Sequence, residues 1–260
     1  MIKKILNRAA WVLVFTLVIF LLVFANIERN SRHTSELKVT LHACEYPSLT
    51  SADRIQSHIL ENMPSIIGQS IKHIALEAIE EEVSLNTQVS NVRAFLNING
   101  DMSIKAKPRE AILRIFDHKG HHLYLGKDKI LMDNSLESSH RLIVANGNIP
   151  HINNEERIQI LKGKTELPEI YYHLYDFVNK IHEDEFLEAL IDQIYIDKKG
   201  QIELTPKIGV KKICFGGFEN SEEKFFNLKT FYLNGKDRID WQKYQSINIK
   251  YKNQIVCSKK

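Results

Sequence analysis

Three histidines lie close together in the sequence, at His118, His121 and His122, around the turn of an expected hairpin. Imidazoles at such spacing can hold zinc when a further cysteine or carboxylate completes the ligand set. The neighbouring sequence supplies no obvious fourth ligand, and successive residues of a strand point to opposite faces. His121 and His122 therefore diverge, and we predict an exposed hairpin without a metal ion.

Carboxylates and glycines offer two further candidate sites. Glu183, Asp184 and Glu185 could include the paired carboxylates of a glycosidase, but a helix N-terminus that favours acidic side chains explains them more simply. Gly216-Gly217 lacks the frame of a phosphate-binding loop, and the sequence contains no G-x-S-x-G motif. We therefore predict no enzymatic activity, no cofactor and no small-molecule substrate.

The cysteines do not form a recognisable motif. Cys44, Cys214 and Cys257 are far apart, and no CxxC or Cys/His spacing accompanies them. In an oxidising compartment two of them could form a disulfide bond, which would leave the third cysteine unpaired. We interpret all three as small buried hydrophobic residues.

The composition is that of ordinary globular material. Charged residues make up 26% of the chain, hydrophobic residues 43%, and the net charge is only +3. Lysines and arginines are scattered among acidic residues, which argues against nucleic-acid binding, although the C-terminal end is locally basic.

The N-terminal region contains an apolar run, AAWVLVFTLVIFLLVFANI at 9–27, without a charged side chain. As a helix it would be about 28 Å long, close to the hydrocarbon thickness of a bilayer. The lysine and arginine bias predicts a cytoplasmic tail at 1–8 and an exported body after a linker at 28–36. The alternative is a cleaved signal peptide ending near Val23-Phe24-Ala25, but the apolar run is longer than a typical signal core.

The sequence pattern at 37–109 predicts a small α+β module, in which two helices cover one face of a three-stranded sheet. Two alternating runs around Asn99-Gly100 predict a hairpin, because these residues tolerate the positive φ of a tight turn. Thr50 or Ser51 can cap the first helix. The expected elements are a strand at 37–43, helices at 51–62 and 70–85, and strands at 89–98 and 102–107.

The region 110–260 predicts a mainly β domain with a few helices. Hairpins are expected where Asp117 to Gly120 and Asp197 to Gly200 form turns between alternating runs. Expected strands lie at 112–116, 121–125, 141–145, 191–196, 201–205, 210–215, 247–252 and 254–257, and expected helices at 169–180, 184–190 and 221–231.

The ordered set of segments resembles the FtsQ/DivIB family of cell-division proteins. The resemblance rests on NVRAFLNINGDMSIKAKPREAILRI, then RLIVANGNIP, and then DQIYIDKKGQIELTPKIGVKKICFGG, KFFNLKTFY and WQKYQSINIKYKNQIVC, which are similar to the version found in Bacteroidetes-type bacteria. Ala111 stands where the family often has proline. The resemblance implies a cytoplasmic tail, a transmembrane helix at 9–27, a POTRA-like domain at 37–109 and a β domain at 110–260.

The C-terminal stretch 247–257 is the candidate interaction surface. A terminal strand at a sheet edge leaves backbone N–H and C=O groups that can pair with a strand from another protein. The resemblance implies binding of the FtsB-like member of an FtsB/FtsL pair at this end. Lys250 and Tyr251 match the family's basic-aromatic pair, and the residues expected to meet the partner strand are Asn253, Gln254, Ile255 and Val256.

The resulting hypothesis is a single-pass inner-membrane scaffold with a periplasmic body that links its partners to the septal peptidoglycan synthesis machinery. Membrane anchoring raises local concentration, so modest contacts can suffice. One rival is a POTRA-containing assembly or secretion factor, although the sequence after residue 110 lacks the repeated amphipathic strands of a membrane barrel. A second rival is an anchored cell-wall enzyme.

Overall fold

The computed structural model describes residues 2–31, 33–43, 48–97, 99–133, 141–235, 239–252 and 254–259. The chain divides into two compact units. The first comprises Met1–Ala43, Ser51–Ser84 and Asn91–Lys107, and the second comprises Cys44–Thr50, Leu85–Ser90 and Pro108–Lys260. Their α+β character agrees with the predicted fold class.

Helix α1 (Ile2–Ser31) begins the first unit. It contains the apolar run predicted at 9–27, and the large hydrophobic side chains between Trp11 and Phe24 are exposed. Within the described residues, no helix combines the length and apolarity that a membrane crossing requires.

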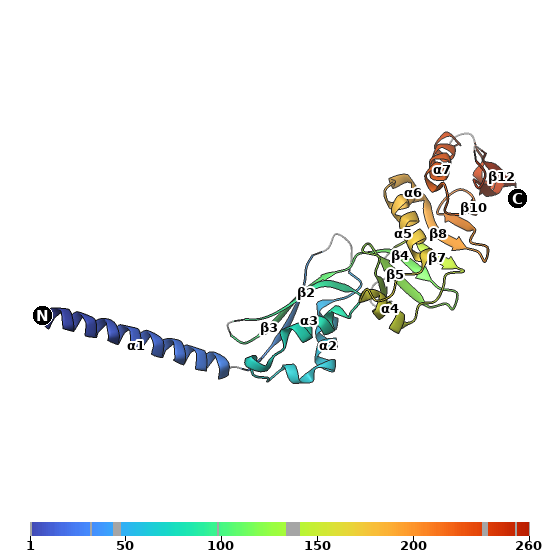
Figure 1. The fold of residues 1–260 in the computed structure, drawn as a ribbon. Helices are drawn as coiled ribbons and strands as arrows, with labels where there is room; N and C mark the ends of the chain where they lie inside the picture. The colour runs from blue at the N-terminus through green and yellow to red at the C-terminus, as the bar shows by residue number, and fades with distance from the viewer. Residues whose placement is uncertain are drawn as a thin grey trace. The chain divides into compact units, whose positions relative to one another are not determined.

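The first unit follows the predicted order of strand, helix, helix, strand and strand (Figure 1). Its sheet has the order β1-β3-β2, with β1 parallel to β3. The side chain of Ser51 caps α2 by accepting a hydrogen bond from the N–H of Arg54, as expected for a serine before a helix. The bounds are β1 (Leu37–Leu41), α2 (Ala52–Asn62), η1 (Pro64–Ile66), η2 (Ile71–His73), α3 (Leu76–Ser84), β2 (Val89–Leu96) and β3 (Met102–Pro108).

The second helix of this unit is shorter than predicted. Instead of one helix at 70–85, the chain forms the 3-10 turn η2 and then α3. Ile74 between them has extended backbone angles, φ −78° and ψ 115°, which interrupt the helical hydrogen-bond series. Of the apolar residues in this stretch, Ile79 is buried and Ile71 and Ile74 are partly buried, whereas Ala75 and Ala78 are exposed.

The core of the first unit lies between its helices and its sheet. Alternate residues of β3, from Met102 to Ala106, are fully buried, as a strand with one covered face requires. Ile55 and Ile59 of α2 and Ile79 and Val83 of α3 supply the facing side chains.

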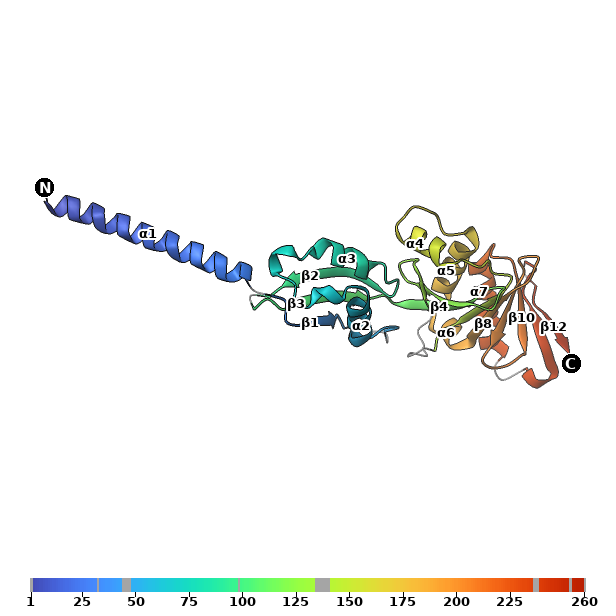
Figure 2. The same cartoon turned by 90° about the horizontal axis from the view of Figure 1, so that it is seen from below.

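The second unit contains a nine-stranded mixed sheet in the order β12-β11-β10-β9-β8-β7-β4-β5-β6. Figure 2 shows β4, β8, β10 and β12 of this sheet. Four α-helices of the described chain belong to it. The strands are β4 (Ala111–Phe116), β5 (His122–Gly126), β6 (Leu131–Asp133), β7 (Val144–Gly147), β8 (Ile191–Ile196), β9 (Ile202–Pro206), β10 (Lys212–Gly216), β11 (Tyr244–Asn248) and β12 (Val256–Lys259). The helices are α4 (Asn154–Leu161), α5 (Glu169–His182), α6 (Glu185–Leu190) and α7 (Ser221–Gly235), with the 3-10 turn η3 (Trp241–Lys243) before β11.

Three neighbouring pairs of this sheet are parallel, β4 with β7, β7 with β8 and β10 with β11, and helices connect the last two pairs. Strand β7 leads through α4, α5 and α6 to its parallel neighbour β8, and β10 leads through α7 to its parallel neighbour β11. Parallel neighbours need a long connection, because a tight turn reverses the chain direction and can therefore join only antiparallel strands. The crossovers bring α5 and α7 together over β10, where the rings of Phe177, Phe215 and Phe225 pack at centroid separations of 4.9–5.0 Å.

The predicted hairpins are confirmed, but four strands of the second unit differ from their predicted bounds by two residues or more, including β10 (predicted at 210–215), and β6 has no counterpart in the prediction. The strand predicted at 141–145 is β7 at 144–147, and α4 has no counterpart in the prediction. The strand predicted at 247–252 is β11, which begins at Tyr244 and ends at Asn248. The side-chain oxygen of Asn248 accepts a hydrogen bond from the N–H of Lys250, so a local turn replaces the strand there. The strand predicted at 254–257 is β12 at 256–259.

The two edges of the large sheet differ. At β6, the side-chain amide of Gln88 donates to the carbonyl of Asp133, and the N–H of Asp133 donates to the Thr87 hydroxyl. At the other edge, β12 pairs with β11 on one side and meets no further strand of the described chain.

Candidate functional site

The C-terminal edge of the large sheet carries the predicted interaction residues. Strand β12 pairs antiparallel with β11, which matches Asn248 with Val256 and Ile247 with Cys257. The Ile247 side chain is fully buried, whereas Val256 is 41% exposed. At this edge, β11 is therefore packed into the core and β12 is the outer strand that faces solvent.

The predicted residues occupy the turn between these strands and the start of β12. Lys250 and Tyr251 lie in the turn, Gln254 and Ile255 lead into β12, and Val256 is its first residue. Asn253 lies outside the described residues. Strand β11 is flanked on both sides, so only the part of the predicted stretch 247–257 that belongs to β12 forms an edge.

Lys250 rests on the end of a core strand. Gly216, the last residue of β10, has φ +88°, and a Cβ added there would lie 2.9 Å from Cγ of Lys250. Only glycine adopts this backbone conformation readily, and only glycine leaves room for the lysine stem. The turn that carries Lys250 and Tyr251 is thus seated on Gly216, while both side chains remain exposed.

Beside this turn, the chain leaves a cleft of about 560 Å³. One wall is formed by α7 and the other by the residues that lead into β12. The lining residues include Asn227, Thr230, Phe231 and Asn234 of α7 together with Gln254 and Ile255. Two of the predicted interaction residues therefore face a hollow next to the open edge, which the sequence did not reveal.

The outer face of α7 continues this surface with apolar side chains. Phe226 is 69% exposed and Leu233 is 56% exposed, and their separation by seven residues places them on one helix face. The opposite face of α7 is anchored by buried Phe225 and Leu228. Phe231 of the same helix is only partly buried and lines the cleft.

Electrostatics distinguish this end of the chain. Residues 241–260 contain five lysines and no acidic residue. Lys250, Lys252 and Lys259 are exposed in and beside β12. A partner segment that pairs with this edge would gain from acidic side chains of its own.

The described cysteines lie in this part of the sheet but do not form a disulfide bond. Cys214 is matched with Asn248 on β11, and Cys257 is matched with Ile247, so one strand separates them. Two strand spacings amount to roughly 9.6 Å, beyond the reach of a disulfide. Burial is the main cause that raises the pKa of the Cys214 thiol and the only cause that raises the pKa of the Cys257 thiol. Both thiols are therefore poor nucleophiles. Cys44 lies outside the described residues.

The predicted carboxylate cluster is explained by helix capping. Asp184 caps α6 by accepting hydrogen bonds from the N–H groups of Phe186 and Leu187, and Nζ of Lys229 lies 2.6 Å from its carboxylate. The hydrogen bond from Lys229 is the main reason that the pKa of Asp184 falls below its ordinary value. This ion pair joins α6 to α7.

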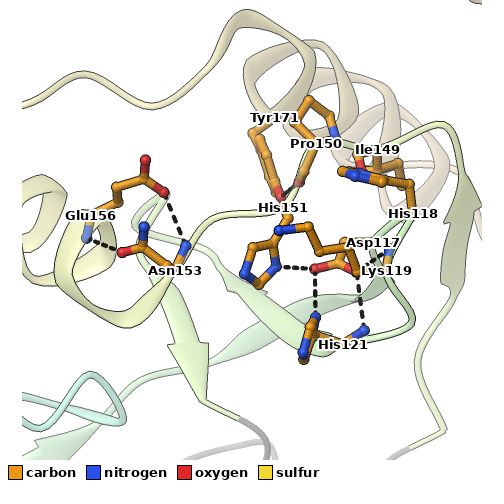
Figure 3. Close-up of polar contacts among 10 residues, drawn as sticks. All are labelled: Asp117, His118, Lys119, His121, Ile149, Pro150, His151, Asn153, Glu156 and Tyr171. Atoms are coloured by element: carbon orange, nitrogen blue, oxygen red, sulfur yellow. Dashed lines mark hydrogen bonds and ion pairs between the residues drawn. The ribbon is translucent and has the colours of Figure 1, made fainter.

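The histidines around the first hairpin separate as predicted, but one meets an unpredicted partner (Figure 3). His122 stacks on Phe116 with ring centroids 5.3 Å apart. His121 instead approaches His151, 4.5 Å away between ring centroids, and both rings lie beside the carboxylate of Asp117. His151 follows β7, and the parallel pairing of β4 with β7 brings the ends of these strands together. No local motif in the sequence signalled this contact.

Comparison with known proteins agrees with the arrangement of the second unit. A search of curated proteins finds no match to the chain. The family model described as FtsQ/DivIB, C-terminal related, matches residues 110–258, which is more than half of the chain. The matched range includes all nine strands of the large sheet apart from the last residue of β12. The chain therefore belongs to the FtsQ/DivIB C-terminal related family.

Proposed function

We propose that this protein is a cell-division scaffold that binds an FtsB/FtsL-type partner pair through its C-terminal edge and links that pair to the septal peptidoglycan synthesis machinery. Family membership indicates a role related to cell division and an association with the divisome, within the cell envelope. Members of this family are typically non-enzymatic, and we propose binding as the activity here too.

The observation that carries the proposal is the side of β12 that pairs with no other strand of the described chain. An edge strand presents a row of backbone donors and acceptors to solvent, and an extended segment of another protein can satisfy them. The neighbouring strand β11 is fixed by Ile247, which is fully buried, so the edge is held in place before a partner arrives. A preformed edge lowers the ordering cost of binding.

The cleft beside β12 supports a partner with both a strand and a helix. A strand added to β12 runs past Ile255 and the cleft, and a preceding or following helix can lay its apolar side on Phe226 and Leu233 of α7. Such a partner matches the expected coiled-coil pair, whose helices carry an apolar stripe. The exposed lysines favour acidic residues in the pairing segment.

The proposal includes a single-pass inner-membrane location with an N-terminal cytoplasmic tail, a POTRA-like domain at 37–109 and a β domain at 110–260. It rests on the uncharged sequence at 9–27 and on the division of the folded chain into two compact units. Protease digestion of sealed spheroplasts tests the location, because a periplasmic body is digested from outside while the tail is protected. Protection of the body would contradict it.

Binding of the FtsB/FtsL-type pair from the same organism to the full-length protein tests the central claim. Deletion of 256–260 removes β12, and Ile255→Asp places a charge at the cleft. Both changes should lower affinity by about tenfold or more, because each removes contacts near the centre of the interface. Ile208→Asp is the control, since this side chain is 69% exposed in the connection between β9 and β10.

A pair of proline variants separates strand pairing from side-chain contacts. Successive N–H groups of an edge strand alternate between the neighbouring strand and solvent, so Cys257→Pro and Ser258→Pro remove donors on opposite sides. One variant should lose partner binding with its melting temperature unchanged, and the other should be destabilised. Full partner binding by both variants would refute strand addition at β12.

A further inference from the structure

Three potential metal ligands from two separate segments converge in the second unit (Figure 3). Asp117 and His121 belong to the turn between β4 and β5, and His151 follows β7. Their ligand atoms all lie within 4.8 Å of one another. The Asp117 side chain is 1% exposed, whereas those of His121 and His151 are 61% and 21% exposed. The cluster thus has a buried carboxylate at its base and two imidazoles at its mouth.

We propose that Asp117, His121 and His151 form a binding site for one Zn²⁺ ion, with one coordination position left open to water. This proposal is independent of partner binding at β12. It replaces the expectation of a metal-free hairpin, which considered only His118, His121 and His122.

The interatomic distances are compatible with this ligand set. Oδ2 of Asp117 lies 3.5 Å from Nδ1 of His121 and 2.5 Å from Nδ1 of His151. Ligand atoms roughly 2.1 Å from a tetrahedral zinc ion are about 3.4 Å from one another. His121 therefore already stands at the required separation. His151 must move away from the carboxylate by about 0.9 Å, which a small rotation of a partly exposed ring provides.

The carboxylate is oriented by contacts that leave one oxygen for the metal. Oδ1 of Asp117 accepts hydrogen bonds from the N–H groups of Lys119 and His121, at 2.8 and 3.0 Å. Oδ2 remains directed at both imidazoles.

The two segments are also fixed to each other. The backbone N–H and Nδ1 of His118 both bond to the carbonyl of Ile149, at 3.0 and 2.9 Å. The hydroxyl of Tyr171, a fully buried residue, donates to the carbonyl of Pro150 at 2.7 Å. Outer contacts of this kind orient metal ligands and lower the cost of assembling a site.

The donor set favours zinc over the alkaline-earth ions. Two imidazole nitrogens and one carboxylate oxygen suit Zn²⁺, which accepts mixed nitrogen and oxygen ligands in a tetrahedral arrangement. Mg²⁺ and Ca²⁺ prefer oxygen ligands and six or more of them. A bound ion would join the turn at 117–121 to the segment at 149–151 and so stabilise the native state by mass action.

The experiment is isothermal titration of the full-length, chelator-treated protein, without a polyhistidine tag, with Zn²⁺. Wild-type protein should bind one ion tightly, and titration with Co²⁺ should give the visible absorption of a tetrahedral complex. His121→Ala and His151→Ala should each weaken binding by more than about 100-fold, since loss of a direct ligand exceeds the loss of an outer contact. Asp117→Asn keeps the oxygen that caps the turn and removes the metal ligand, so it should fold and bind weakly.

His122→Ala is the matched control, because it removes a neighbouring imidazole that stacks on Phe116 away from the cluster. It should bind Zn²⁺ as wild type does. Zn²⁺ should also raise the melting temperature of wild type and His122→Ala but not that of Asp117→Asn. The proposal is overturned if the Asp117 and His151 variants bind like wild type, if His122→Ala is equally impaired, or if Mg²⁺ binds in preference. A purely hydrogen-bonded cluster would show no saturable one-to-one binding.

Discussion

Two phenylalanines of the second unit are expected to separate stability from partner binding. Phe177 of α5 is 2% exposed and packs against Phe215, Phe218 and Phe225 at centroid separations of 4.9–5.4 Å. Phe226, next in the chain after Phe225, is 69% exposed. Alanine at 177 opens a cavity in the core, whereas alanine at 226 removes a solvent-facing ring.

The magnitudes follow from these surroundings. Truncation of a buried phenylalanine costs about 3–5 kcal/mol of unfolding free energy. Three aromatic neighbours place Phe177→Ala near the top of that range, since each ring pair adds about 0.5–1.5 kcal/mol beyond area burial. With a urea dependence near 2 kcal/mol per molar, the midpoint should fall by roughly 2 M. Phe226→Ala should change stability by less than about 0.5 kcal/mol but weaken partner affinity about tenfold.

Fluorescence of Trp241 provides the assay for stability. Its indole stacks on Tyr232 with centroids 4.7 Å apart and meets Phe231 edge-on, so it reports unfolding around α7. The other tryptophan, Trp11, is replaced by phenylalanine in every protein compared. If Phe177→Ala does not fold, Phe177→Leu, with a smaller cavity, takes its place. Equal destabilisation by the 177 and 226 variants would refute the assignment of the two faces, and unchanged partner affinity of Phe226→Ala would remove α7 from the interface.

Three further predictions concern the same unit. Asp184→Ala should lower unfolding free energy by about 1–2 kcal/mol, because α6 loses its cap and Lys229 its partner. Since the pKa of Asp184 is depressed in the folded state, its contribution is present above the unfolded-state pKa of about 3.9 and is lost as pH falls through the folded-state pKa, which urea titrations between pH 3 and 7 measure. Gly147→Ala should lose about 2–5 kcal/mol in the same assay, because Gly147 has φ +105° and a Cβ would lie 2.1 Å from a backbone oxygen of β8. After the native protein is treated with a mild oxidant and then unfolded in urea, both Cys214 and Cys257 should still react with an alkylating agent. If neither thiol reacts, the two cysteines have formed a disulfide, which would contradict the strand order.

Local turn chemistry made much of the fold predictable. Asp117 and Asp197 each accept hydrogen bonds from two following backbone N–H groups in their turns, and the glycine at the end of each turn has positive φ. These contacts lie within five residues, so the sequence displays them directly. Ser51, one of the two caps expected for α2, is confirmed for the same reason, and Asp184 lies at the acidic helix start expected at 183–185.

The missed features have both local and distant causes. Helix α4 has no apolar stripe, and its buried residue is Arg157, so hydrophobic periodicity does not indicate a helix. Strand β11 ends at Asn248 although alternation continues to Lys252, because the local turn satisfies the backbone there. The sequence predicts an interaction stretch at the C-terminal end but does not indicate the cleft beside it, which requires α7 to lie beside Ile255. His151 meets Asp117 only through the parallel pairing of β4 with β7.

The asymmetry between the borders of the nine-stranded sheet limits how the protein can assemble. Side chains of Thr87 and Gln88 bond the backbone groups of Asp133 at the β6 border, whereas β12 meets no further strand of the described chain, so a strand would add to this sheet at β12. Two copies meeting through β12 would use up each other's open border and form a closed pair. A continuous fibril would need a second open border on every copy. A second copy paired at β12 in this way would compete directly with a partner strand for the same border.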